Sequence, residues 1–488
     1  MTDTLMVGVS GIRGIVGTDL TPEIVARYAA AFGTWAKAGK REEGRGKGRP
    51  AVVLGRDART SGPMFAHAAL AGLVSVGCDV IDVGLVPTPT VQLAVEHHHA
   101  AGGIILTASH NPIEWNALKF VGPDGIFLDT ADGTRVRALA DGDGIPRGDW
   151  SAVGRLREDG DALERHLDAV LRLPAVNTRA IRRRRFTVAL DCVRGAGGTI
   201  MPELLERLGC RVSGMDLDPD GRFPRAPEPI PENLKRLGAL VRRSRADLGI
   251  AVDPDVDRLA IVDERGRAIG EDYTLAFAVR AVLGQAVPKG LPGGRGRSGG
   301  RRKPASARPA DRPSVVVCNL STSLVVEDAA KAYGAGVVRA PVGEAHVARK
   351  ILELGAKIGG EGNGGVMYPA LHTGRDAPLA AALALALLAR ERATVAELVA
   401  AAPRYVIVKG KVPREGTAAL DRVYAGLRGR FAEALVNVDD GLRLSWADRW
   451  LHVRASNTEP IIRLIAEAPS GAAAEGLVEE GRQVCAAS

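Results

Sequence analysis

Short runs of β-branched and other hydrophobic residues alternate along the chain with longer stretches of helical periodicity. The same pattern of three runs occurs three times, and in each copy the second run begins with glycine. The runs lie at 51–55, 77–82 and 103–107, at 187–191, 209–213 and 248–252, and at 314–318, 334–338 and 356–359. Strands that alternate with helices are typical of βαβ units. The pattern therefore predicts an α/β protein with three related domains and mixed, largely parallel sheets.

The last part of the chain departs from this pattern. It predicts a strand over 405–412, a helix over 417–434, strands within 442–453 and a final helix over 471–485. We expect a smaller α+β domain there. The four predicted domains are 1–155, 156–264, 265–400 and 401–488.

Three unusual loops each follow the third strand of a copy. They are 107–112 (TASHNP), 253–258 (DPDVDR) and 360–365 (GEGNGG). Ligands of open α/β sheets bind beyond the carboxyl ends of the strands, so three equivalent loops predict one shared site. A fourth segment, 454–460 (RASNTEP), is expected in the turn between a strand and the last helix. Its arginine, hydroxyl and amide groups could hold a phosphate there.

Alternating aspartates make 253–258 a candidate metal site. The carboxylates of Asp253, Asp255 and Asp257 can converge when the loop curls, and three anions so close together need a cation. Mg²⁺ is the expected ion, because it takes a few carboxylates together with a phosphate oxygen. A calcium-binding EF-hand is excluded, because Arg258 stands where that loop requires glycine.

Ser109 is the candidate carrier of a covalent group. A hydrolase nucleophile elbow would require glycines where this chain has Thr107 and Asn111, which argues against a serine hydrolase. We expect Ser109 to carry a phosphoryl group instead. The added charge of about −1.5 to −2 needs positive neighbours, and Arg13, Lys119 and the metal site could supply them.

The glycine-rich loop satisfies the G-x-G-x-x-G pattern of dinucleotide-binding folds. That motif must open a helix, and the residues that follow (VMYP, 366–369) do not start one. A nucleotide site is therefore not expected. Glu361 and Asn363 on this glycine frame are expected to hydrogen-bond the vicinal hydroxyls of a sugar.

Charge and composition argue against a membrane protein and against a nucleic-acid-binding protein. With 46% hydrophobic and 25% charged residues among 488, the chain is typical of a globular protein. It lacks the long uncharged apolar run of a membrane helix. Eight Lys or Arg and one Asp in 288–313 account for most of the net charge of +8, and the six Gly and five Pro there predict a flexible basic insertion. Because the rest of the chain is nearly neutral, a nucleic-acid partner is not expected.

The cell compartment is expected to be the cytoplasm. Five scattered cysteines form no CxxC pair, which predicts reduced thiols rather than a disulfide framework or a zinc site. The first ten residues also lack the basic and apolar regions of a signal peptide.

Taken in order, five segments resemble the α-D-phosphohexomutase superfamily, which includes phosphoglucomutase, phosphomannomutase and phosphoglucosamine mutase. They are 11–14 (GIRG), 107–112, 253–258, 360–365 and 454–460. The resemblance spans essentially the whole chain. It implies four domains around a central cleft, each of which contributes one loop.

The resemblance also implies roles for single residues. Ser109 is implied as the phosphoserine and, with Asp253, Asp255 and Asp257, as a ligand of one Mg²⁺. Lys119 is implied in proton transfer, and Arg13, His110 and Arg258 near the phosphoryl group. Sugar binding is implied for Glu361 and Asn363, and phosphate binding for Arg454, Ser456, Asn457, Thr458 and Arg463.

The implied reaction has two transfers. Phospho-Ser109 gives its phosphoryl group to a sugar hydroxyl, the resulting hexose 1,6-bisphosphate turns around, and Ser109 takes the other phosphoryl group. The bisphosphate is the implied activator, and the enzyme is expected as a monomer or homodimer. Glucosamine phosphate is the expected substrate, with glucose or mannose phosphate as alternatives. A serine-dependent sugar phosphatase and a non-catalytic sugar-phosphate-binding protein are more distant alternatives.

Overall fold

The computed structural model describes residues 5–8, 11–42, 48–142, 144–285, 314–413, 418–456 and 461–487. The predicted insertion 288–313 and the predicted phosphate-binding residues Asn457 and Thr458 lie outside these described residues. Among the helices in the described ranges, none combines the length and apolar character that a membrane span requires.

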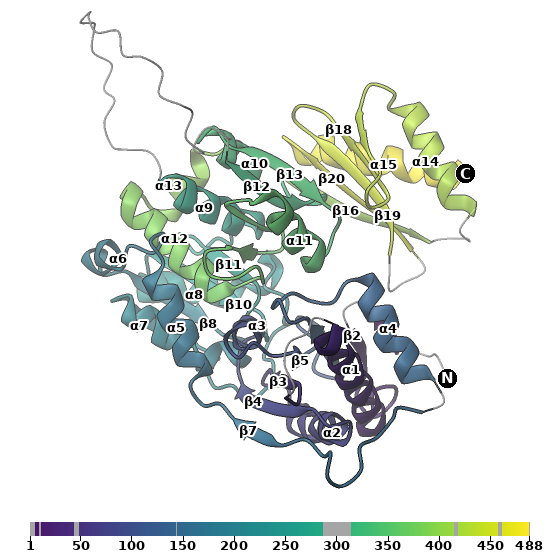
Figure 1. The fold of residues 1–488 in the computed structure, drawn as a ribbon. Coiled ribbons are helices and arrows are strands. Elements are labelled where there is room, and N and C mark those ends of the chain that lie inside the picture. The colour runs from purple at the N-terminus through teal and green to yellow at the C-terminus, as the bar shows by residue number, and fades with distance from the viewer. Residues whose placement is uncertain are drawn as a thin grey trace, which may run out of the picture.

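Three sheets repeat one strand order, in which the first strand of a copy lies between the second and the third. An antiparallel strand then pairs with the third (Figure 1). The first sheet has β4 (Asp79–Leu85), β3 (Ala51–Arg56), β5 (Gly102–Leu106) and β6 (Trp115–Val121). The second has β9 (Arg211–Met215), β8 (Thr187–Asp191), β10 (Leu248–Val252) and β11 (Leu259–Val262). The third has β13 (Gly336–Ala340), β12 (Val315–Asn319), β14 (Ile358–Glu361) and β15 (Gly365–Met367). The predicted mixed, largely parallel α/β sheets are confirmed.

The first sheet is the widest of the three. Its order is β1-β2-β6-β5-β3-β4-β7, with β1 (Met6–Gly8) and β7 (Leu156–Glu158) at its edges and β2 (Gly11–Ile15) between β1 and β6. Its helices are α1 (Pro22–Glu42), α2 (Gly62–Ser75), α3 (Thr88–His97) and α4 (Thr130–Asp141). Helices α1 and α2 bury Phe32 and Phe65 in its core, where the Phe32 ring stacks on Phe120 of β6 at a centroid distance of 5.0 Å.

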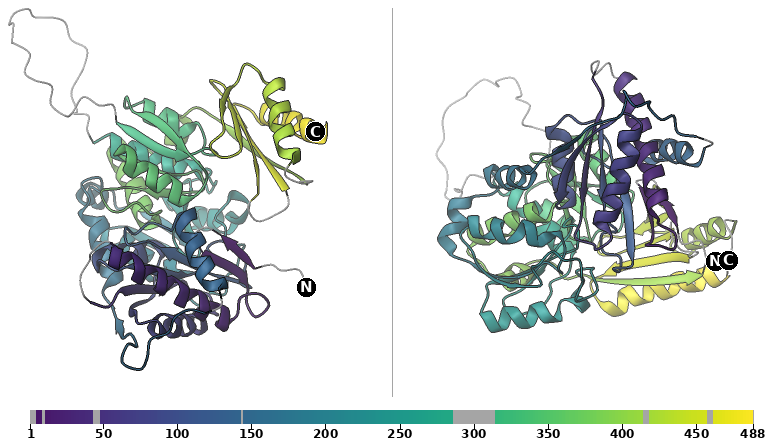
Figure 2. Two further views of the ribbon diagram at one scale, coloured as in Figure 1. Left: turned by 45° about the vertical axis from the view of Figure 1, so that its right-hand side comes forward. Right: turned by 90° about the horizontal axis from the view of Figure 1, so that it is seen from below.

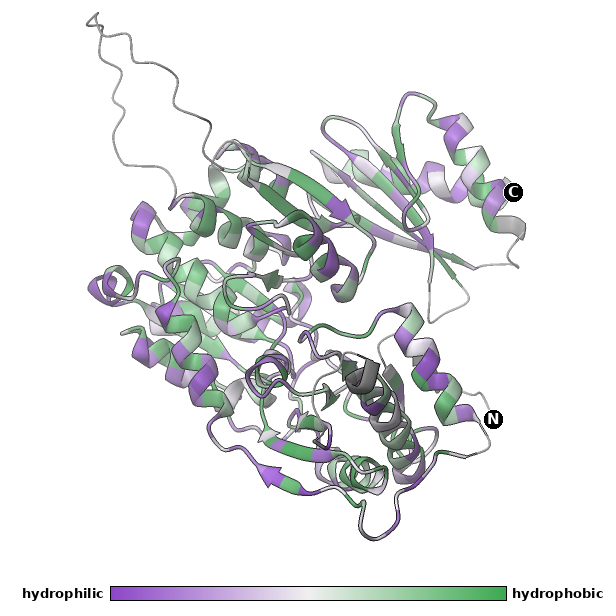
Figure 3. Ribbon diagram, viewed as in Figure 1, coloured by the Kyte–Doolittle hydropathy of each residue, from purple (hydrophilic) through white to green (hydrophobic). Residues whose placement is uncertain are grey.

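The second and third domains share one continuous hydrophobic core. Helix α12 (Ala377–Glu391) is buried and apolar on all sides over residues 377–389, and it is green in Figure 3. Asp376 caps this helix, because its carboxylate accepts a hydrogen bond from the Leu379 N–H (2.7 Å). The other helices of these domains are α5 (Ala162–Arg172), α6 (Thr178–Arg184), α7 (Met201–Arg207), α8 (Lys235–Ser244), α9 (Asp272–Leu283), α10 (Val325–Lys331), α11 (Glu344–Leu354) and α13 (Val395–Ala400).

The fourth domain is a five-stranded antiparallel sheet with two helices, and it lies beside the third domain in the left view of Figure 2. Its sheet order is β16 (Val406–Pro413), β20 (Ile461–Ala468), β19 (Trp450–Ala455), β18 (Leu442–Ser445) and β17 (Leu435–Asn437). Helices α14 (Ala418–Arg430) and α15 (Gly471–Ala487) complete it. The Leu324 N–H of the third domain donates to Glu467 of β20 (2.8 Å).

One expectation for this domain is wrong. Segment 454–460 was expected to lead from a strand into the last helix, but it leads from β19 into β20. The sequence IIRLIAEA of β20 alternates between buried and less buried positions, as a strand requires. Because β20 pairs with both β16 and β19, a helix N-terminus cannot bind phosphate at this turn.

Candidate active site

Ser109 lies in the loop between β5 and β6, at the carboxyl end of its sheet. Its backbone adopts a left-handed conformation (φ 49°), which is strained for a residue other than glycine and typical of functional sites. Its hydroxyl donates to Asp253 Oδ2 at 3.0 Å and lies 3.4 Å from His110 Nδ1. The predicted phosphoryl carrier and the predicted metal loop are therefore in direct contact.

Arg59 holds the serine loop in this conformation, although no sequence motif pointed to this residue. Its guanidinium donates to four backbone carbonyl oxygens between residues 109 and 115, at 2.6 to 2.8 Å. It also pairs with the fully buried Asp57 (3.2 Å), whose carboxylate accepts from Thr107 (2.6 Å). One buried ion pair thus fixes the backbone on both sides of Ser109.

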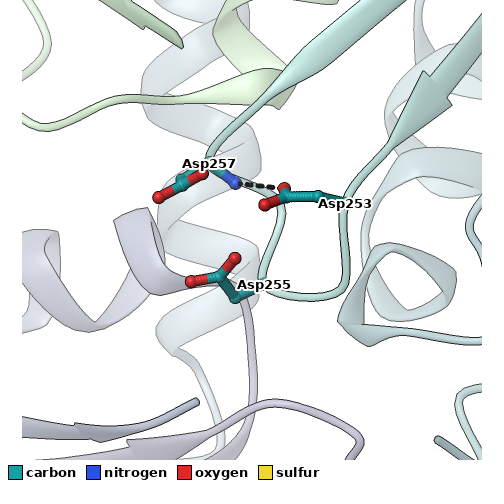
Figure 4. A group of neighbouring side chains, drawn as sticks. All are labelled: Asp253, Asp255 and Asp257. Atoms are coloured by element: carbon teal, nitrogen blue, oxygen red, sulfur yellow. Dashed lines mark hydrogen bonds between the residues drawn. The ribbon is translucent and has the colours of Figure 1, made fainter. Parts of the chain in front are cut away.

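The three aspartates of the metal loop converge as predicted (Figure 4). Asp253, Asp255 and Asp257 are fully buried, and each offers one carboxylate oxygen within 4.8 Å of the other two. Burial, together with repulsion from the other two aspartates, raises the pKa of Asp253 well above its usual range. Burial opposes ionisation of Asp255 as well, but Lys119 outweighs it and lowers the pKa of that carboxyl.

The donor set of this cluster fits a divalent cation. Lys119 Nζ (2.7 Å) and the Thr88 hydroxyl (2.9 Å) both occupy Asp255 Oδ2. Within the described part of the chain, Asp255 Oδ1 and Asp257 Oδ1 are buried without any hydrogen-bond partner. A buried acceptor without a donor is costly, and small hard cations such as Mg²⁺ prefer such oxygen ligands. The predicted metal ligands therefore fit the predicted ion.

Cationic and neutral donors surround the serine and the aspartates. Arg13 donates to Asn111 Oδ1 of the serine loop (2.7 Å), and Arg258 pairs with Glu228 (3.1 Å) and lies 3.7 Å from Asp257. His110 is a neutral imidazole, because burial and the nearby arginines lower its pKa to about 2. The four side chains predicted near the phosphoryl group, including Lys119, thus gather at the Ser109–aspartate contact.

The glycine-rich segment meets the metal loop directly. Glu361 is not in a loop as expected, because it forms the last position of β14 and pairs with Gly365 of β15. Asn363 lies in the tight turn between these strands and donates to Glu361 (3.4 Å). Gly364 has φ +88°, and a Cβ there would lie 2.4 Å from the Leu259 carbonyl oxygen. The glycine frame therefore lets β11 of the metal domain approach this turn.

Arg375, at the entrance to α12, was also missed. Its guanidinium contacts Asp257, Glu344 and Glu361, and so joins the loop of the three aspartates to strand β14. No local motif marks Arg375 or Arg59. Only Arg59 has a usable signal, because it shortly follows the carboxyl end of the parallel strand β3, where open sheets bind ligands.

Among the predicted phosphate-binding residues that the structure describes, Arg454 lies on β19, Ser456 directly follows β19, and Arg463 lies on β20. Arg454 of β19 is in register with Arg463 of β20, and Ser456 is buried at the end of β19. In the described ranges, the carboxylate nearest to Arg454 in an ion pair is Asp440 (4.0 Å), of the same domain, and Arg454 Nε is buried without a partner. Arg454 thus takes no part in the contacts described above for Ser109, the aspartates and Glu361. That Arg454 binds the phosphate of the substrate stays a prediction.

Four family models match successive parts of the chain. All are described as phosphoglucomutase/phosphomannomutase: alpha/beta/alpha domain I over residues 4–143, domain II over 164–266, domain III over 303–405 and the C-terminal domain over 407–484.

Relatives match over nearly the whole chain. The phosphoglucomutase/phosphomannomutase of Thermococcus kodakarensis is 38% identical and covers 97% of both chains. A probable phosphoglucosamine mutase of Methanopyrus kandleri is 36% identical over 97% of this chain and 96% of its own.

Solved structures agree with this relationship. A phosphoglucomutase/phosphomannomutase family protein of Burkholderia thailandensis has a TM-score of 0.81 at 25% identity and covers 99% of this chain and 97% of that chain. The Aspergillus fumigatus N-acetylphosphoglucosamine mutase, solved in complex with GlcNAc-6P and magnesium, shares the fold (TM-score 0.56, 15% identity, 98% and 95% covered). Because the models, the relatives and the site geometry agree, the chain belongs to the phosphoglucomutase/phosphomannomutase (α-D-phosphohexomutase) superfamily and is a phosphohexomutase.

Proposed function

We propose that this phosphohexomutase interconverts hexosamine 6-phosphate and hexosamine 1-phosphate, with glucosamine as the sugar, through phospho-Ser109 and a 1,6-bisphosphate intermediate. The observation that carries the proposal is the contact between the Ser109 hydroxyl and Asp253 (3.0 Å). It brings a carrier hydroxyl to a cluster of three buried carboxylates suited to Mg²⁺.

The chain's own residues have separate tasks in this proposal. Asp253, Asp255, Asp257 and the Ser109 oxygen are the ligands of one Mg²⁺, which when bound neutralises charge on the transferring phosphoryl group. Arg13 and Arg258 add positive charge at the same place. Glu361 and Asn363 orient the sugar hydroxyls, and Arg454, Ser456, Asn457, Thr458 and Arg463 hold the phosphate that does not react. These assignments combine the contacts of the described residues with the family resemblance.

The first transfer breaks the bond between phosphorus and Ser109 Oγ and forms a bond between phosphorus and the sugar hydroxyl oxygen. The sugar hydroxyl loses its proton, and the departing Ser109 oxygen gains one. We assign the uptake of the sugar proton to the neutral amine form of Lys119, whose Nζ lies 2.7 Å from Asp255 and 3.8 Å from Asp257. The second transfer reverses these bonds at the other end of the bisphosphate. In the dephosphorylated state the Ser109 hydroxyl donates to Asp253 (3.0 Å), which orients its oxygen for the attack on the second phosphoryl group. In this second transfer Ser109 Oγ loses its proton and the released sugar oxygen gains one.

The choice of glucosamine rests on the relatives' names. Proteins of Methanopyrus kandleri and Methanosarcina acetivorans, 36% and 34% identical to this chain, are named probable phosphoglucosamine mutases. Glucose or mannose phosphate is the second candidate, because the 38% identical Thermococcus kodakarensis protein is named a phosphoglucomutase/phosphomannomutase. We place the reaction in the cytoplasm, in keeping with cysteines that are all free thiols.

A substrate panel tests the proposal. The purified chain, primed with the matching 1,6-bisphosphate and Mg²⁺, is given glucosamine, glucose and mannose 6-phosphates in turn. We expect the highest kcat/KM with glucosamine 6-phosphate. A higher value with glucose or mannose phosphate would favour the second candidate, and release of inorganic phosphate without isomerisation would indicate a phosphatase instead.

A further inference from the structure

Arg375 holds three buried carboxylates from two domains. Its Nη2 donates to Asp257 (2.5 Å), its Nη1 to Glu361 (2.8 Å) and its Nε to Glu344 (3.0 Å). Burial alone would lower the pKa of this guanidinium, but the three carboxylates raise it well above its ordinary value. Arg375 is therefore a permanent cation between the metal loop and the sugar-binding strand.

Glu361 has no spare acceptor position in this arrangement. Its Oε2 accepts from Arg375 and Asn363, and its Oε1 accepts from Asn319 (2.9 Å) and the Gly343 N–H (3.0 Å). Four donors fill the roughly four lone-pair sites of a carboxylate. A sugar hydroxyl that donates to Glu361 must therefore displace one of them, and the bond from Asn363 (3.4 Å) is the longest. The Glu361 carboxylate must therefore shift when the sugar binds. The oxygen that Asn363 would release, Oε2, is also the one that accepts from Arg375.

Asp257 lies at the other end of the same guanidinium. Arg375 donates a hydrogen bond to Asp257 Oδ2. The other oxygen, Asp257 Oδ1, is buried without a hydrogen-bond partner in the described part of the chain. Because Arg375 occupies Oδ2 of Asp257, Oδ1 is the oxygen that is left to bind a cation. A shift of the guanidinium toward or away from Glu361 changes the position of Asp257.

Glu344 provides a fixed anchor for this bridge. It accepts the Arg375 Nε–H and also the Gln92 side-chain amide of α3 in the first domain (3.0 Å). A bidentate, planar guanidinium can keep three such partners in place, whereas the ammonium of lysine acts as a point charge. The bridge therefore needs arginine rather than any cation.

We propose that Arg375 is a positioning residue that couples sugar binding at Glu361 to cation binding at Asp257. This inference rests on the proposed function, because it assigns the sugar to Glu361 and the cation to the aspartates. Coupling between two ligands is reciprocal. Sugar phosphate should therefore bind more tightly when Mg²⁺ is present, and Mg²⁺ more tightly when sugar phosphate is present.

Calorimetry on the dephosphorylated full-length enzyme tests the coupling. Glucosamine 6-phosphate is titrated with and without saturating Mg²⁺, and Mg²⁺ with and without the sugar phosphate. For the wild type we expect each ligand to strengthen the other about 10-fold. For Arg375→Lys we expect each ligand to strengthen the binding of the other by a factor below about 2. We also expect kcat to fall about 100-fold, with KM changed by less than about threefold.

Matched variants separate this role from a general loss of stability. Arg390→Lys changes a partly buried arginine of the same domain that donates to backbone carbonyl oxygens of α9, and it should keep the coupling. Should Arg375→Lys not fold, the isosteric Glu361→Gln loosens the other end of the bridge and should also lower the coupling factor. Wild-type coupling in a folded Arg375→Lys or Glu361→Gln enzyme would overturn the inference. A wild type that isomerises no hexose phosphate would instead refute the proposed function.

Discussion

The hydroxyl of Ser109 donates to Asp253 Oδ2 over 3.0 Å, although the two residues are 144 positions apart and belong to different sheets. The contact follows from the repeated strand pattern of the first two domains. Both residues occupy the loop between the third parallel strand of a copy and the antiparallel strand after it. Equivalent loops of two domains thus place the proposed phosphoryl carrier against the proposed cation site, and the third copy places Glu361 at the last position of its third strand, β14.

Mg²⁺ should stabilise the folded protein, because three buried carboxylates repel one another without a cation. A ligand that binds only the folded state, present at about 100 times its Kd, adds about 2.7 kcal/mol. We expect thermal unfolding to show a higher midpoint with Mg²⁺ than with a chelator. Asp255→Asn should lose most of this shift, whereas Asp421→Asn on the surface of α14 should keep it. Equal shifts in both variants would place the cation elsewhere.

Arg59→Met should destabilise the protein strongly. The substitution leaves Asp57 buried without its cation, which typically costs about 3–5 kcal/mol, and frees four carbonyl oxygens around Ser109. Urea unfolding measures the loss, and the rate of phosphoryl transfer to Ser109 should fall with it. The exposed Arg27→Met is the control. The double variant Arg59→Met, Asp57→Asn should recover part of the lost stability. A double variant that is no more stable than Arg59→Met would contradict this explanation.

Asp272 should make stability fall as the pH rises. Burial raises the pKa of its carboxyl to about 8, against about 3.9 in an unfolded chain. The folded state therefore holds the proton more tightly, so the stabilisation is complete below about pH 4 and is lost progressively toward pH 8. Asp272→Asn keeps an acceptor for the Ser323 N–H (2.8 Å) and should remove this loss.

Thermal unfolding at two pH values measures the effect of Asp272. The variant should exceed the wild type at pH 8.5, by a margin that shrinks at pH 5.5. Asp421→Asn, at an exposed position, should show no such trend. A margin that grows as the pH falls would mean that the Asp272 carboxyl is not protonated in the folded state.

The sequence could predict the parts of the site that repeat or cluster. The loops after β5, β10 and β14 were predictable because hydrophobic runs mark the strands and polar residues follow them. Asp253, Asp255 and Asp257 were predictable because alternation along one short loop brings carboxylates together.

Long-range partners could not be predicted in this way. Arg375 contacts Asp257 from 118 positions away, and Arg59 contacts the Ser109 carbonyl from 50 away, so no local spacing reveals either. Strand β20 was missed because its pairing with both β16 and β19 is a tertiary property. The β19–β20 connection consequently differs from the strand-to-helix turn expected for 454–460.

The central claim, that Ser109 lends and recovers a phosphoryl group, is tested most directly by intact mass. The purified chain is incubated with a hexose 1,6-bisphosphate and Mg²⁺, and then with excess hexose 6-phosphate. We predict a species heavier by one phosphate that forms in the first step, falls in proportion in the second step as phosphoryl groups pass to the sugar, and never forms in Ser109→Ala. A phosphorylated Ser109→Ala protein, or a wild type that isomerises sugar phosphates without ever gaining mass, would contradict the account.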